Sequence, residues 1–470
     1  MSVPVLAVAE MRAWEQASWA AGVRESDVIA SVGLQLAAAI RAATSETDRV
    51  LVLVGRGNNG ADARAAAAHL GSRVADVLEV RDPAADLPKL SAALLPKPAL
   101  VVDGLFGIGL NRPLDPAWVQ FIETLNQSRL RVLSVDVPSG LDADTGEHWG
   151  AAVHAWKTAT VGAPKRGLLE PAAWTPVGTL EVLREVGLAG KPVAADERDW
   201  VLAEDFESWP PPRGISSNKG DLGRLVVIAG SVGYAGAAIL SARSASRARP
   251  GLLAALVPET VHGVVSGAVP SAMVHSFEPY HSLWDRAAAV LAGPGLAAPD
   301  LPAELRAEVL RLWREFPGAM VVDASALAWL VEMPKTWEPA GLRILTPHPG
   351  EAARLLRSTV AGVQENRVAA LRALAVRYRS LVVLKGHQTL TGTATGRIQV
   401  NSSGNPGLAQ GGTGDVLAGY LAGLLAQPGM AASPERTAAY AVWEHGRTAD
   451  RLESVRRNWT AEDLADAIGA

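Results

Sequence analysis

The run NPGLAQGGTGD (residues 405–415), followed directly by VLAGYLAGLLAQ (416–427), decides how this chain is interpreted. The first part is dense in glycine and closes on one carboxylate, Asp415, and the second part has the apolar pattern of a buried helix. Backbone N–H groups at a helix start attract anions, and glycine lets a phosphate approach them closely. The run alone therefore predicts phosphoryl transfer to a small alcohol, with Asp415 taking the hydroxyl proton. A plain glycine-rich loop with a capping Asp is the alternative.

Short apolar runs bounded by glycine or proline precede this segment and alternate with helical stretches, as in a parallel sheet buried on both faces. QTLTGTATGRIQVN (388–401) is rich in threonine and broken by glycines, which predicts an antiparallel hairpin. The other predicted strands of this half are RLVVIAG (224–230), LLAALVP (252–258), AAAVLAGPG (287–295), AMVVDAS (319–325), RILTPHPGE (343–351) and SLVVLKG (380–386).

The first half of the chain repeats this alternation. Residues 10–43 have helical spacing, whereas residues 187–217 contain a triple proline and little periodicity. We therefore predict an α/β protein with domains at 1–190 and 213–470 and a linker at 191–212. Each domain is expected to be a mainly parallel sheet sandwiched by helices, Rossmann-like in the first half. The predicted strands of the first half are RVLVLVG (49–55), ALVVDGL (99–105), LRVLSVDVPSG (130–140) and TATVGAP (158–164).

Composition excludes several classes of protein. The 470 residues carry a formal net charge of −4, no cysteine and no basic run. Disulfides, thiolate metal sites and a cysteine nucleophile are excluded, and no nucleic-acid partner is expected. Neither a signal peptide nor a long uncharged apolar run is evident, so we expect no membrane partner and a cytoplasmic location. We also expect a homo-oligomer, although the sequence does not fix its size.

The segment GRGNNGADA (55–63) follows a predicted strand and opens a helical run. Its glycines permit a tight turn, and Asn58 and Asn59 offer side-chain amides. Asp62 is expected in the first turn of the helix. A strand, a glycine loop and a helix in this order predict a phosphate or nucleotide site, with a plain βα turn as the alternative.

Two further strands of this half end in acidic, glycine-containing segments, VVDGLFGIGLNRPLD (101–115) and VDVPSGLDADTGE (135–147). The carboxyl ends of parallel strands converge on one rim, where Asn59, Asp103 and Ser139 would supply oxygen ligands. Such hard oxygens suit an alkali or alkaline-earth cation better than zinc. Asp136 would act as a proton-transfer group, and the two later aspartates of the second segment are expected to be turn formers.

These motifs, in this order and spacing, resemble the NAD(P)H-hydrate epimerase domain over roughly residues 5–190, and TATVGAPKRGLL (158–169) and VGTLEV (177–182) match its closing segment. The resemblance implies potassium bound by Asn59, Asp103 and Ser139. It also implies that a hydrated nicotinamide nucleotide is bound by Asp136 together with Asn58, Asn59, Gly60, Ala61, Asp62, Gly107, Ile108, Gly109, Leu110, Asn111, Arg112 and Pro113.

The chain departs from that family in two places. The family usually reads NNGGDG, and Ala61 and Ala63 stand here in place of two glycines. A Cβ at position 61 is expected to block a phosphate or to require a left-handed backbone, which alanine disfavours. The first helical region usually carries Met-Glu-x-Ala-Gly and here reads IASVG (29–33). A degenerate first domain, retained for dimerisation or stability, is therefore an alternative.

Strand ends of the second half place three reactive side chains ahead of the glycine-rich run. Asp323 ends one strand, His348 stands between two prolines and ahead of Glu351, and Lys385 ends another strand. Alone, His348 would be a loop-capping histidine and Lys385 a surface lysine. Because these strand ends are expected to converge on one anion-binding segment, a functional role for the three side chains is favoured.

This combination resembles the ribokinase-like superfamily, and more closely its NAD(P)H-hydrate dehydratase branch, over roughly residues 213–470. The segments that carry the resemblance are KGDLGRLVVIAGS (219–231), LTPHPGE (345–351), LKG (384–386) and NPGLAQGGTGDVLAG (405–419). It implies that ADP phosphorylates the hydroxyl of hydrated NADH or NADPH, and that phosphate then leaves. Magnesium is expected on the nucleotide phosphates.

The resemblance also implies roles for individual residues. Asp415 would be the base, and its place at a helix start is expected to favour the ionised form. The hydrate would be bound by Ala237, Gly293, Gly295 and His348. The nucleotide would be bound by Lys385, Gly386, His387, Gln388, Thr389, Gly411, Gly412, Thr413 and Gly414. The alternatives are a small-molecule kinase and a nucleotide-binding sensor without turnover.

Overall fold

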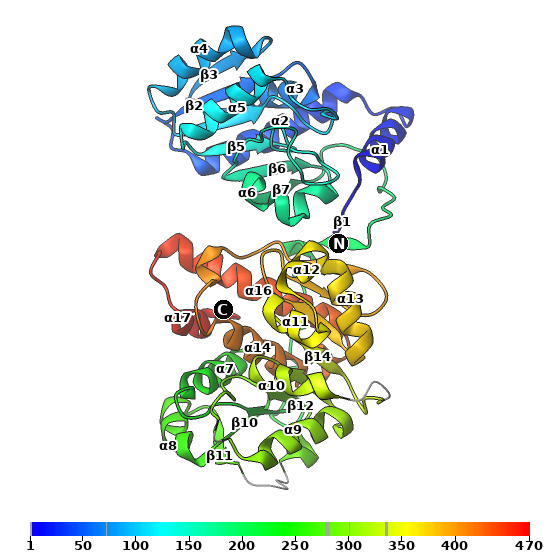
Figure 1. Ribbon diagram of the computed structural model, residues 1–470, viewed down its shortest axis with the longest axis vertical. Coiled ribbons are helices and arrows are strands. Elements are labelled where there is room, and N and C mark those ends of the chain that lie inside the picture. The colour runs from blue at the N-terminus through cyan, green and yellow to red at the C-terminus, as the bar shows by residue number, and fades with distance from the viewer. Residues whose placement is uncertain (1, 72, 278–282, 300, 334–336) are drawn as a thin grey trace. The chain divides into compact units, whose positions relative to one another are not determined.

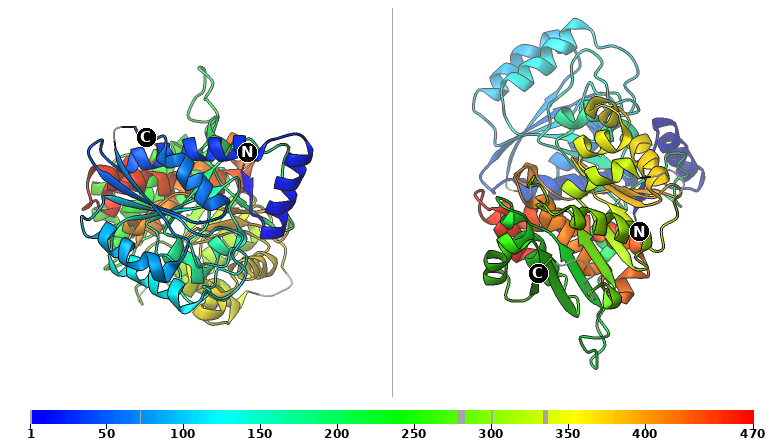
Figure 2. Two further views of the ribbon diagram at one scale, coloured as in Figure 1. Left: turned by 90° about the horizontal axis from the view of Figure 1, so that it is seen from above. Right: turned by 60° about the horizontal axis from the view of Figure 1, so that its bottom comes forward.

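The computed structural model describes residues 2–71, 73–277, 283–299, 301–333 and 337–470. The chain forms two compact units, an N-terminal unit (Val3–Trp200) and a C-terminal unit (Val201–Ala470). Each unit is built on a mainly parallel sheet with helices on both faces (Figures 1 and 2). The predicted α/β class with two sandwiched sheets is therefore confirmed.

The sheet of the N-terminal unit has the strand order β3-β2-β4-β5-β6-β7, with every neighbouring pair parallel. Outside this six-stranded sheet, β1 and β8 form an antiparallel pair. The strands are β1 (Val3–Pro4), β2 (Arg49–Val54), β3 (Val74–Glu79), β4 (Leu100–Gly104), β5 (Val132–Val135), β6 (Lys157–Val161), β7 (Thr179–Leu183) and β8 (Arg198–Trp200). The helices are α1 (Val8–Ala20), α2 (Glu25–Ala43), α3 (Asn58–Ala67), α4 (Pro83–Leu94), α5 (Pro116–Gln127) and α6 (Trp174–Val177).

Side-chain alternation along β2 divides the core of this unit between the two faces of the sheet. Val50, Val52 and Val54 pack with residues of α2 and α3. Leu51 and Leu53 pack with residues of α4 and α5 on the opposite face. Because both faces are covered, the strand is a continuous apolar run, which is why the sequence predicted it correctly.

Helix α2 is, among the residues that the structure describes, the helix long and apolar enough to cross a membrane by length and composition. Its side chains at Val28, Val32, Leu36 and Ile40 belong to the core cluster that contains β2. A buried core helix passes the same length test, so the observation does not indicate a membrane span.

The sheet of the C-terminal unit contains the consecutive strands β11-β10-β9-β12-β13-β14-β15, all parallel, followed by β16 and β17, which are antiparallel. The strands are β9 (Arg224–Ile228), β10 (Leu252–Val257), β11 (Met273–Ser276), β12 (Ala289–Ala292), β13 (Ala319–Val322), β14 (Arg343–Leu345), β15 (Leu381–Leu384), β16 (Leu390–Gly392) and β17 (Ile398–Val400). The helices are α7 (Ala235–Arg247), α8 (Glu259–Ala268), α9 (Ala303–Glu315), α10 (Ser325–Trp329), α11 (Pro349–Leu356), α12 (Val360–Glu365), α13 (Arg367–Tyr378), α14 (Thr413–Leu425), α15 (Pro428–Ala431), α16 (Pro434–Val455) and α17 (Ala461–Ala467).

The apolar helix α14 packs against the sheet and against α7, α16 and α17 in one large core cluster. Two glycines let α14 and α7 approach closely. A Cβ at Gly419 would lie 2.1 Å from the Ser241 carbonyl oxygen, and one at Gly423 would lie 2.7 Å from the Ala245 carbonyl oxygen. The start of α14 is therefore held rigidly beside the carboxyl ends of the strands, as a site built there requires.

Most predicted strands are present, and the hairpin over 388–401 is confirmed as β16 and β17. The prediction for residues 130–140 was too long. The strand β5 ends at Val135 because Asp136 adopts a left-handed backbone with φ 61°. Strands β1, β3, β7, β8 and β11 were not predicted. The sequences of β3 and β11 mix polar and apolar residues without a continuous apolar run.

Candidate active sites

A cavity of about 770 Å³ lies at the carboxyl ends of the strands of the N-terminal unit. Its lining comes from the loop after β2, the start of α3, the loop after β4, Asp136 after β5, and the first helix α1. Eleven of the predicted substrate-binding or catalytic residues line it: Asn58, Asn59, Asp62, Gly107, Ile108, Gly109, Leu110, Asn111, Arg112, Pro113 and Asp136.

Gly60 and Ala61 are not among the residues that line this cavity. Gly60 faces the loop after β2, and a Cβ there would lie 2.2 Å from the Gly55 carbonyl oxygen. Ala61 lies within α3 and donates its backbone N–H to the Gly57 carbonyl oxygen at 3.1 Å. Asp62 is in the second turn of α3, one turn later than predicted.

The expectation that an alanine at position 61 requires a left-handed backbone is wrong. Ala61 has ordinary helical conformation inside α3 and is not among the residues of positive φ. Ala63 is fully buried, and its Cβ lies where a Cβ at Gly104 would approach within 2.4 Å. The two alanines are thus accommodated within α3 without backbone strain. This removes one reason to regard the N-terminal unit as a domain that has lost its activity.

Asp136 is fixed by a buried cation that the sequence analysis did not single out. Lys165, after β6, is fully buried and lies with its Nζ 2.5 Å from Asp136 Oδ1. The same Nζ donates to Thr160 Oγ1 at 3.1 Å and to the Val161 carbonyl oxygen at 2.7 Å. Asp136 Oδ1 also accepts from the Val161 N–H at 3.0 Å. The Asp136 carboxylate is therefore held at one oxygen.

Two further carboxyl groups face the same cavity, Asp62 from α3 and Glu15 from α1. Burial raises the pKa of Asp62 to about 8, and the negative charges of Asp136 and Glu15 add to the effect. Burial also raises the pKa of Glu15, which the Lys165 charge partly offsets. Glu15 was missed because α1 reaches the cavity only through the tertiary fold.

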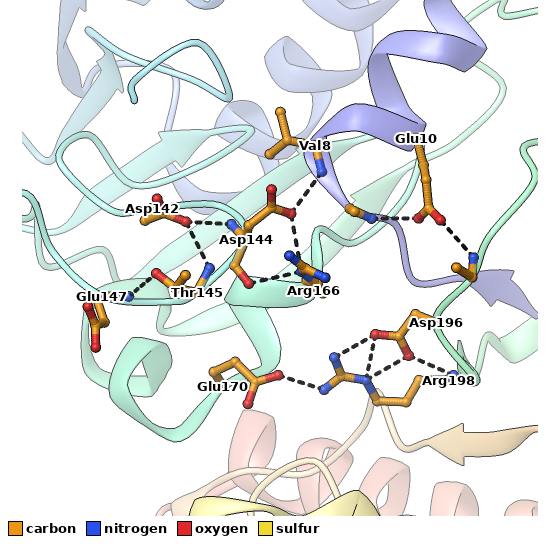
Figure 3. Close-up of polar contacts among 12 residues, drawn as sticks. Val8, Glu10, Asp142, Asp144, Thr145, Glu147, Arg166, Glu170, Asp196 and Arg198 are labelled. Atoms are coloured by element: carbon orange, nitrogen blue, oxygen red, sulfur yellow. Dashed lines mark hydrogen bonds and ion pairs between the residues drawn. The ribbon is translucent and has the colours of Figure 1, made fainter. Parts of the chain in front are cut away.

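Figure 3 shows what holds α1 in place. Asp142 Oδ1 accepts the backbone N–H groups of Asp144 and Thr145, each at 2.8 Å, so Asp142 forms a turn as predicted. Asp144 also accepts the Val8 N–H at 2.9 Å, at the first residue of α1, and its Oδ1 lies 3.3 Å from Arg166 Nε. The loop after β5 therefore fixes the start of the helix that brings Glu15 to the cavity.

The predicted oxygen ligands Asn59, Asp103 and Ser139 are joined through the loop at Phe106. Ser139 Oγ donates to Asp103 Oδ1 at 2.6 Å, and the Phe106 N–H donates to Ser139 Oγ at 2.8 Å. Asn59 Nδ2 lies 2.7 Å from the Phe106 carbonyl oxygen. Burial raises the pKa of Asp103, while the hydrogen bonds from Ser139 act to lower it. These hydrogen bonds bring Asp103 and Ser139 together and link Asn59 to the same loop, and the oxygen atoms of the three side chains are of the kind that bind hard cations.

In the C-terminal unit, Asp415 lies in the first turn of α14, as predicted. Gly412 precedes the helix with φ 95°, a left-handed conformation, and a Cβ there would lie 2.6 Å from Leu240 Cδ1. Thr413 Oγ1 donates to the carbonyl oxygens of Leu408 and Gln410 at 2.9 and 3.1 Å. The turn that precedes Asp415 is therefore held by hydrogen bonds within its own segment.

The expectation that the helix start keeps Asp415 readily ionised needs correction. Burial and the negative charge of Asp323 raise the pKa of Asp415 to about 7, although Lys385 acts in the opposite direction. Desolvation of the Asp415 carboxylate acts against the ionised form, which the helix start was expected to favour. A carboxylate of this kind is a stronger proton acceptor than an ordinary Asp, which suits a general base.

Lys385 is not a surface lysine. Its Nζ lies 2.7 Å from Asp323 Oδ1, which also accepts from Thr346 Oγ1 at 2.7 Å. The negative charges of Asp323 and Glu351 act to raise the pKa of Lys385, and its net pKa is raised despite burial. Asp323, Glu351, Lys385 and Asp415 thus interact as one cluster at adjacent strand ends.

The loop from Lys385 to Thr389 is held by Arg367 at the start of α13. The Arg367 guanidinium donates to the carbonyl oxygens of His387 at 2.5 Å and Leu384 at 3.2 Å. Gly386 has φ 133° and Gln388 has φ 50°. The sequence analysis missed Arg367, because no local motif marks a buried arginine that organises a loop 17 residues further along the chain.

The residues predicted to bind the hydrate lie around the same strand ends. A Cβ at Gly295 would lie 2.9 Å from the Ala237 Cβ, and one at Gly293 would lie 1.8 Å from the Asp323 carbonyl oxygen. His348 caps α11, because its Nδ1 accepts the Gly350 N–H at 3.0 Å. The ring of His348 is more than half exposed, and its Nε2 lies 3.5 Å from Glu351 Oε1.

Comparison with known proteins agrees with both resemblances. The family model described as NAD(P)H-hydrate dehydratase matches residues 225–469, and the model described as YjeF-related protein N-terminus matches residues 25–81 and 77–167. The chain is 35% identical to the bifunctional NAD(P)H-hydrate repair enzyme Nnr of Gloeobacter violaceus, over 95% of this chain and 93% of the relative. The corresponding enzyme of Coxiella burnetii is also 35% identical, over 97% and 96% of the two chains.

Among solved structures, a ribokinase-like superfamily protein from Enterococcus faecalis aligns with a TM-score of 0.50 and 27% identity. The alignment covers 60% of this chain and 97% of that chain. These comparisons do not favour a small-molecule kinase joined to a degenerate first domain.

Proposed function

This chain belongs to the family of bifunctional NAD(P)H-hydrate repair enzymes, and on that premise we propose which residues carry its two reactions. The enzyme repairs hydrated NADH and NADPH by epimerising the R and S hydrates and by dehydrating the hydrate. We assign epimerisation to residues 1–190 and dehydration to residues 213–470, joined by residues 191–212. The observation that supports the assignment best is Asp415, a half-buried carboxylate at the start of α14 whose charge interacts with that of Lys385.

In the proposed dehydration, Asp415 takes the proton of the hydrate hydroxyl while that oxygen attacks the terminal phosphoryl group of ADP. The backbone N–H groups from Gly411 to Gly414 and the Lys385 ammonium stabilise the charge that develops on the phosphoryl oxygens. AMP leaves, inorganic phosphate then departs from the phosphorylated hydrate as the neighbouring ring carbon loses a proton to solvent, and the dihydropyridine is restored. Magnesium on the nucleotide phosphates would supply further charge neutralisation.

Incubation with the S hydrate and ADP tests this assignment. The dihydronicotinamide absorbance is expected to return with ADP and to stay low without a nucleotide. A parallel reaction with ATP measures the nucleotide preference, which we propose lies with ADP. Absence of any recovery with either nucleotide contradicts the proposed dehydratase.

The pKa of Asp415, about 7, predicts the pH dependence of dehydration. Below pH 7 the carboxyl holds its own proton and cannot accept another, so kcat/KM for the hydrate should fall about tenfold per pH unit. Above pH 7 the rate should level off. The measurement is the initial rate between pH 5 and 9 at saturating ADP, and a flat profile from pH 5.5 to 8 would oppose this role.

In the N-terminal unit we propose that the 770 Å³ cavity binds the hydrated nicotinamide nucleotide and that Asp136 transfers a proton during epimerisation. The fixed Oδ1 and the place of Asp136 in the cavity lining support this role. The loop from Gly107 to Pro113 forms much of the remaining lining.

We further propose that potassium is bound by Asn59, Asp103 and Ser139, where it would neutralise the buried Asp103 carboxylate and brace the loop at Phe106. Replacing potassium by tetramethylammonium is then expected to lower both the epimerisation rate and the Tm of the N-terminal unit, because a bound ion stabilises the folded state. Lithium serves as a control for ion size. Equal Tm values in all three salts would argue against the site.

A cytoplasmic location and a homo-oligomeric assembly complete the proposal. Light scattering on the purified full-length chain tests the assembly, and a monomer at micromolar concentration would contradict it. Fractionation of expressing cells tests the location, which a membrane or secreted pool would contradict.

A further inference from the structure

The cavity of the N-terminal unit contains two carboxyl groups that are equally buried and unequally partnered. Asp62 and Asp136 are each 8% exposed. Asp136 is bonded to the Lys165 ammonium at 2.5 Å, to the Val161 N–H and to Thr160 Oγ1. Among the described residues, Asp62 makes no hydrogen bond or ion pair through its carboxyl group. An unpaired carboxyl group in such a place avoids carrying a charge.

The charged groups around Asp62 come from four elements. Asp136 and Lys165 follow β5 and β6, Glu15 lies on α1, and Glu25 lies at the start of α2. Arg12 of α1 acts on Glu15. Burial, Asp136, Glu15 and Glu25 all disfavour a charge on Asp62, and Lys165 alone favours it. Because the Lys165 ammonium is paired with the Asp136 carboxylate, it neutralises the charge of Asp136 more than it would that of Asp62.

Epimerisation at a carbon that bears both a hydroxyl group and a nitrogen needs an acid and a base at once. A protonated carboxyl group can give a proton to the departing hydroxyl, and a carboxylate can take one from the incoming water. Two carboxyl groups in different environments provide the two roles within one cavity.

We propose that Asp62 is the general acid of the epimerase site, opposite Asp136 as the base, and that Lys165 positions Asp136 for the second role. This rests on the proposed epimerase function. The C–O bond of the hydrate breaks as Asp62 gives its proton to the hydroxyl, and water leaves while the ring nitrogen forms a double bond to the carbon. A water molecule then adds to the other face and gives a proton to Asp136. The proton then returns from Asp136 to Asp62 through solvent, which restores the starting state of the enzyme. The opposite epimer reacts with the two roles exchanged.

The proton on Asp62 sets an alkaline limit to epimerisation. The pKa of Asp62, about 8, predicts that kcat falls above pH 8 as the acid is lost. The Glu15→Gln substitution removes a negative charge that raises the pKa of Asp62. The fall in kcat at high pH, which we call the alkaline limb of the profile, should therefore move to lower pH. Asp27→Asn is the matched control. It removes one negative charge from an exposed position on α2, outside the groups that act on Asp62, and should leave the limb in place.

The test is the pH profile of R-to-S conversion by the full-length chain, at constant potassium, for the wild type, Glu15→Gln, Asp27→Asn and Asp62→Asn. We expect the limb to move only in Glu15→Gln. Asp62→Asn should lose about 10²-fold in kcat with KM changed less than threefold, because the amide keeps the shape and gives no proton. Dehydration by the same chains reports whether each variant is folded. If Glu15→Gln does not fold, Asp62→Asn alone decides.

A limb that stays in place in Glu15→Gln, or an Asp62→Asn enzyme with wild-type kcat, overturns the role of Asp62. If Asp62→Asn raises KM and leaves kcat unchanged, the role as an acid is also overturned, and Asp62 is then a binding residue. These outcomes all require an active wild type. A wild-type chain that does not epimerise contradicts the proposed function itself, and with it this inference.

Discussion

Replacing Asp415 by Asn is expected to lower kcat for ADP-dependent dehydration by about 10³-fold. The amide preserves the size of the side chain and cannot take the hydroxyl proton. The position at the start of α14 is otherwise unchanged, because Gly412 and Thr413 form the turn through their own backbone and hydroxyl contacts. The measurement is the initial recovery of dihydronicotinamide absorbance from the S hydrate at saturating ADP.

The same Asp415→Asn chain contains its own control, since the proposed epimerase site lies in the other unit. Epimerisation should keep its wild-type rate, and calorimetric binding of ADP should change little. An Asp415→Asn enzyme that dehydrates like the wild type would show that another group takes the proton, or that the chemistry needs none there. A loss of ADP binding equal to the loss of rate would point to a binding role for Asp415.

Replacing Asp136 by Asn is expected to lower the rate of R-to-S conversion by 10²-fold or more, from the loss of a proton acceptor (on the order of 10²–10⁴ for such a group). The free energy of unfolding should fall too, because the fully buried Lys165 loses the carboxylate that compensates its charge. Rates are therefore compared at a temperature where thermal melting shows that the variant is folded.

A combined variant separates the two effects of Asp136→Asn. Adding Lys165→Met removes the uncompensated cation and should recover stability without recovering epimerisation. Dehydration by both chains should stay near the wild-type rate. Recovery of epimerisation together with stability would mean that Asp136 acts only as a structural partner of Lys165, and the catalytic assignment would then be withdrawn.

The sequence predicted those features of each site that depend on residues close together in the chain. Glycine-rich turns at strand ends, Asp415 at a helix start and Asp136 after a strand are fixed by residues close in the chain. The conformation of Ala61 was predicted wrongly, because a helix that begins at Asn58 already accommodates alanine at that position. The local pattern alone did not reveal where that helix begins.

The groups that tune the sites were not predictable from the sequence. Lys165 and Glu15 meet Asp136 and Asp62 only after distant segments pack together. Arg367 reaches the loop at Lys385 from a different helix. Burial and neighbouring charges then determine proton affinity, as for Asp415, where desolvation and the negative charge of Asp323 raise the pKa. Such effects depend on distances through space, and no motif or residue spacing in the sequence marks them.

The most direct test of two coupled repair activities is to supply only the R hydrate, with ADP, magnesium and potassium, to the full-length chain. We expect complete return of dihydronicotinamide absorbance, much faster than spontaneous epimerisation allows, because the N-terminal unit is proposed to convert R to S and the C-terminal unit to dehydrate S. Recovery no faster than spontaneous epimerisation, in a chain that readily dehydrates the S hydrate, would contradict it.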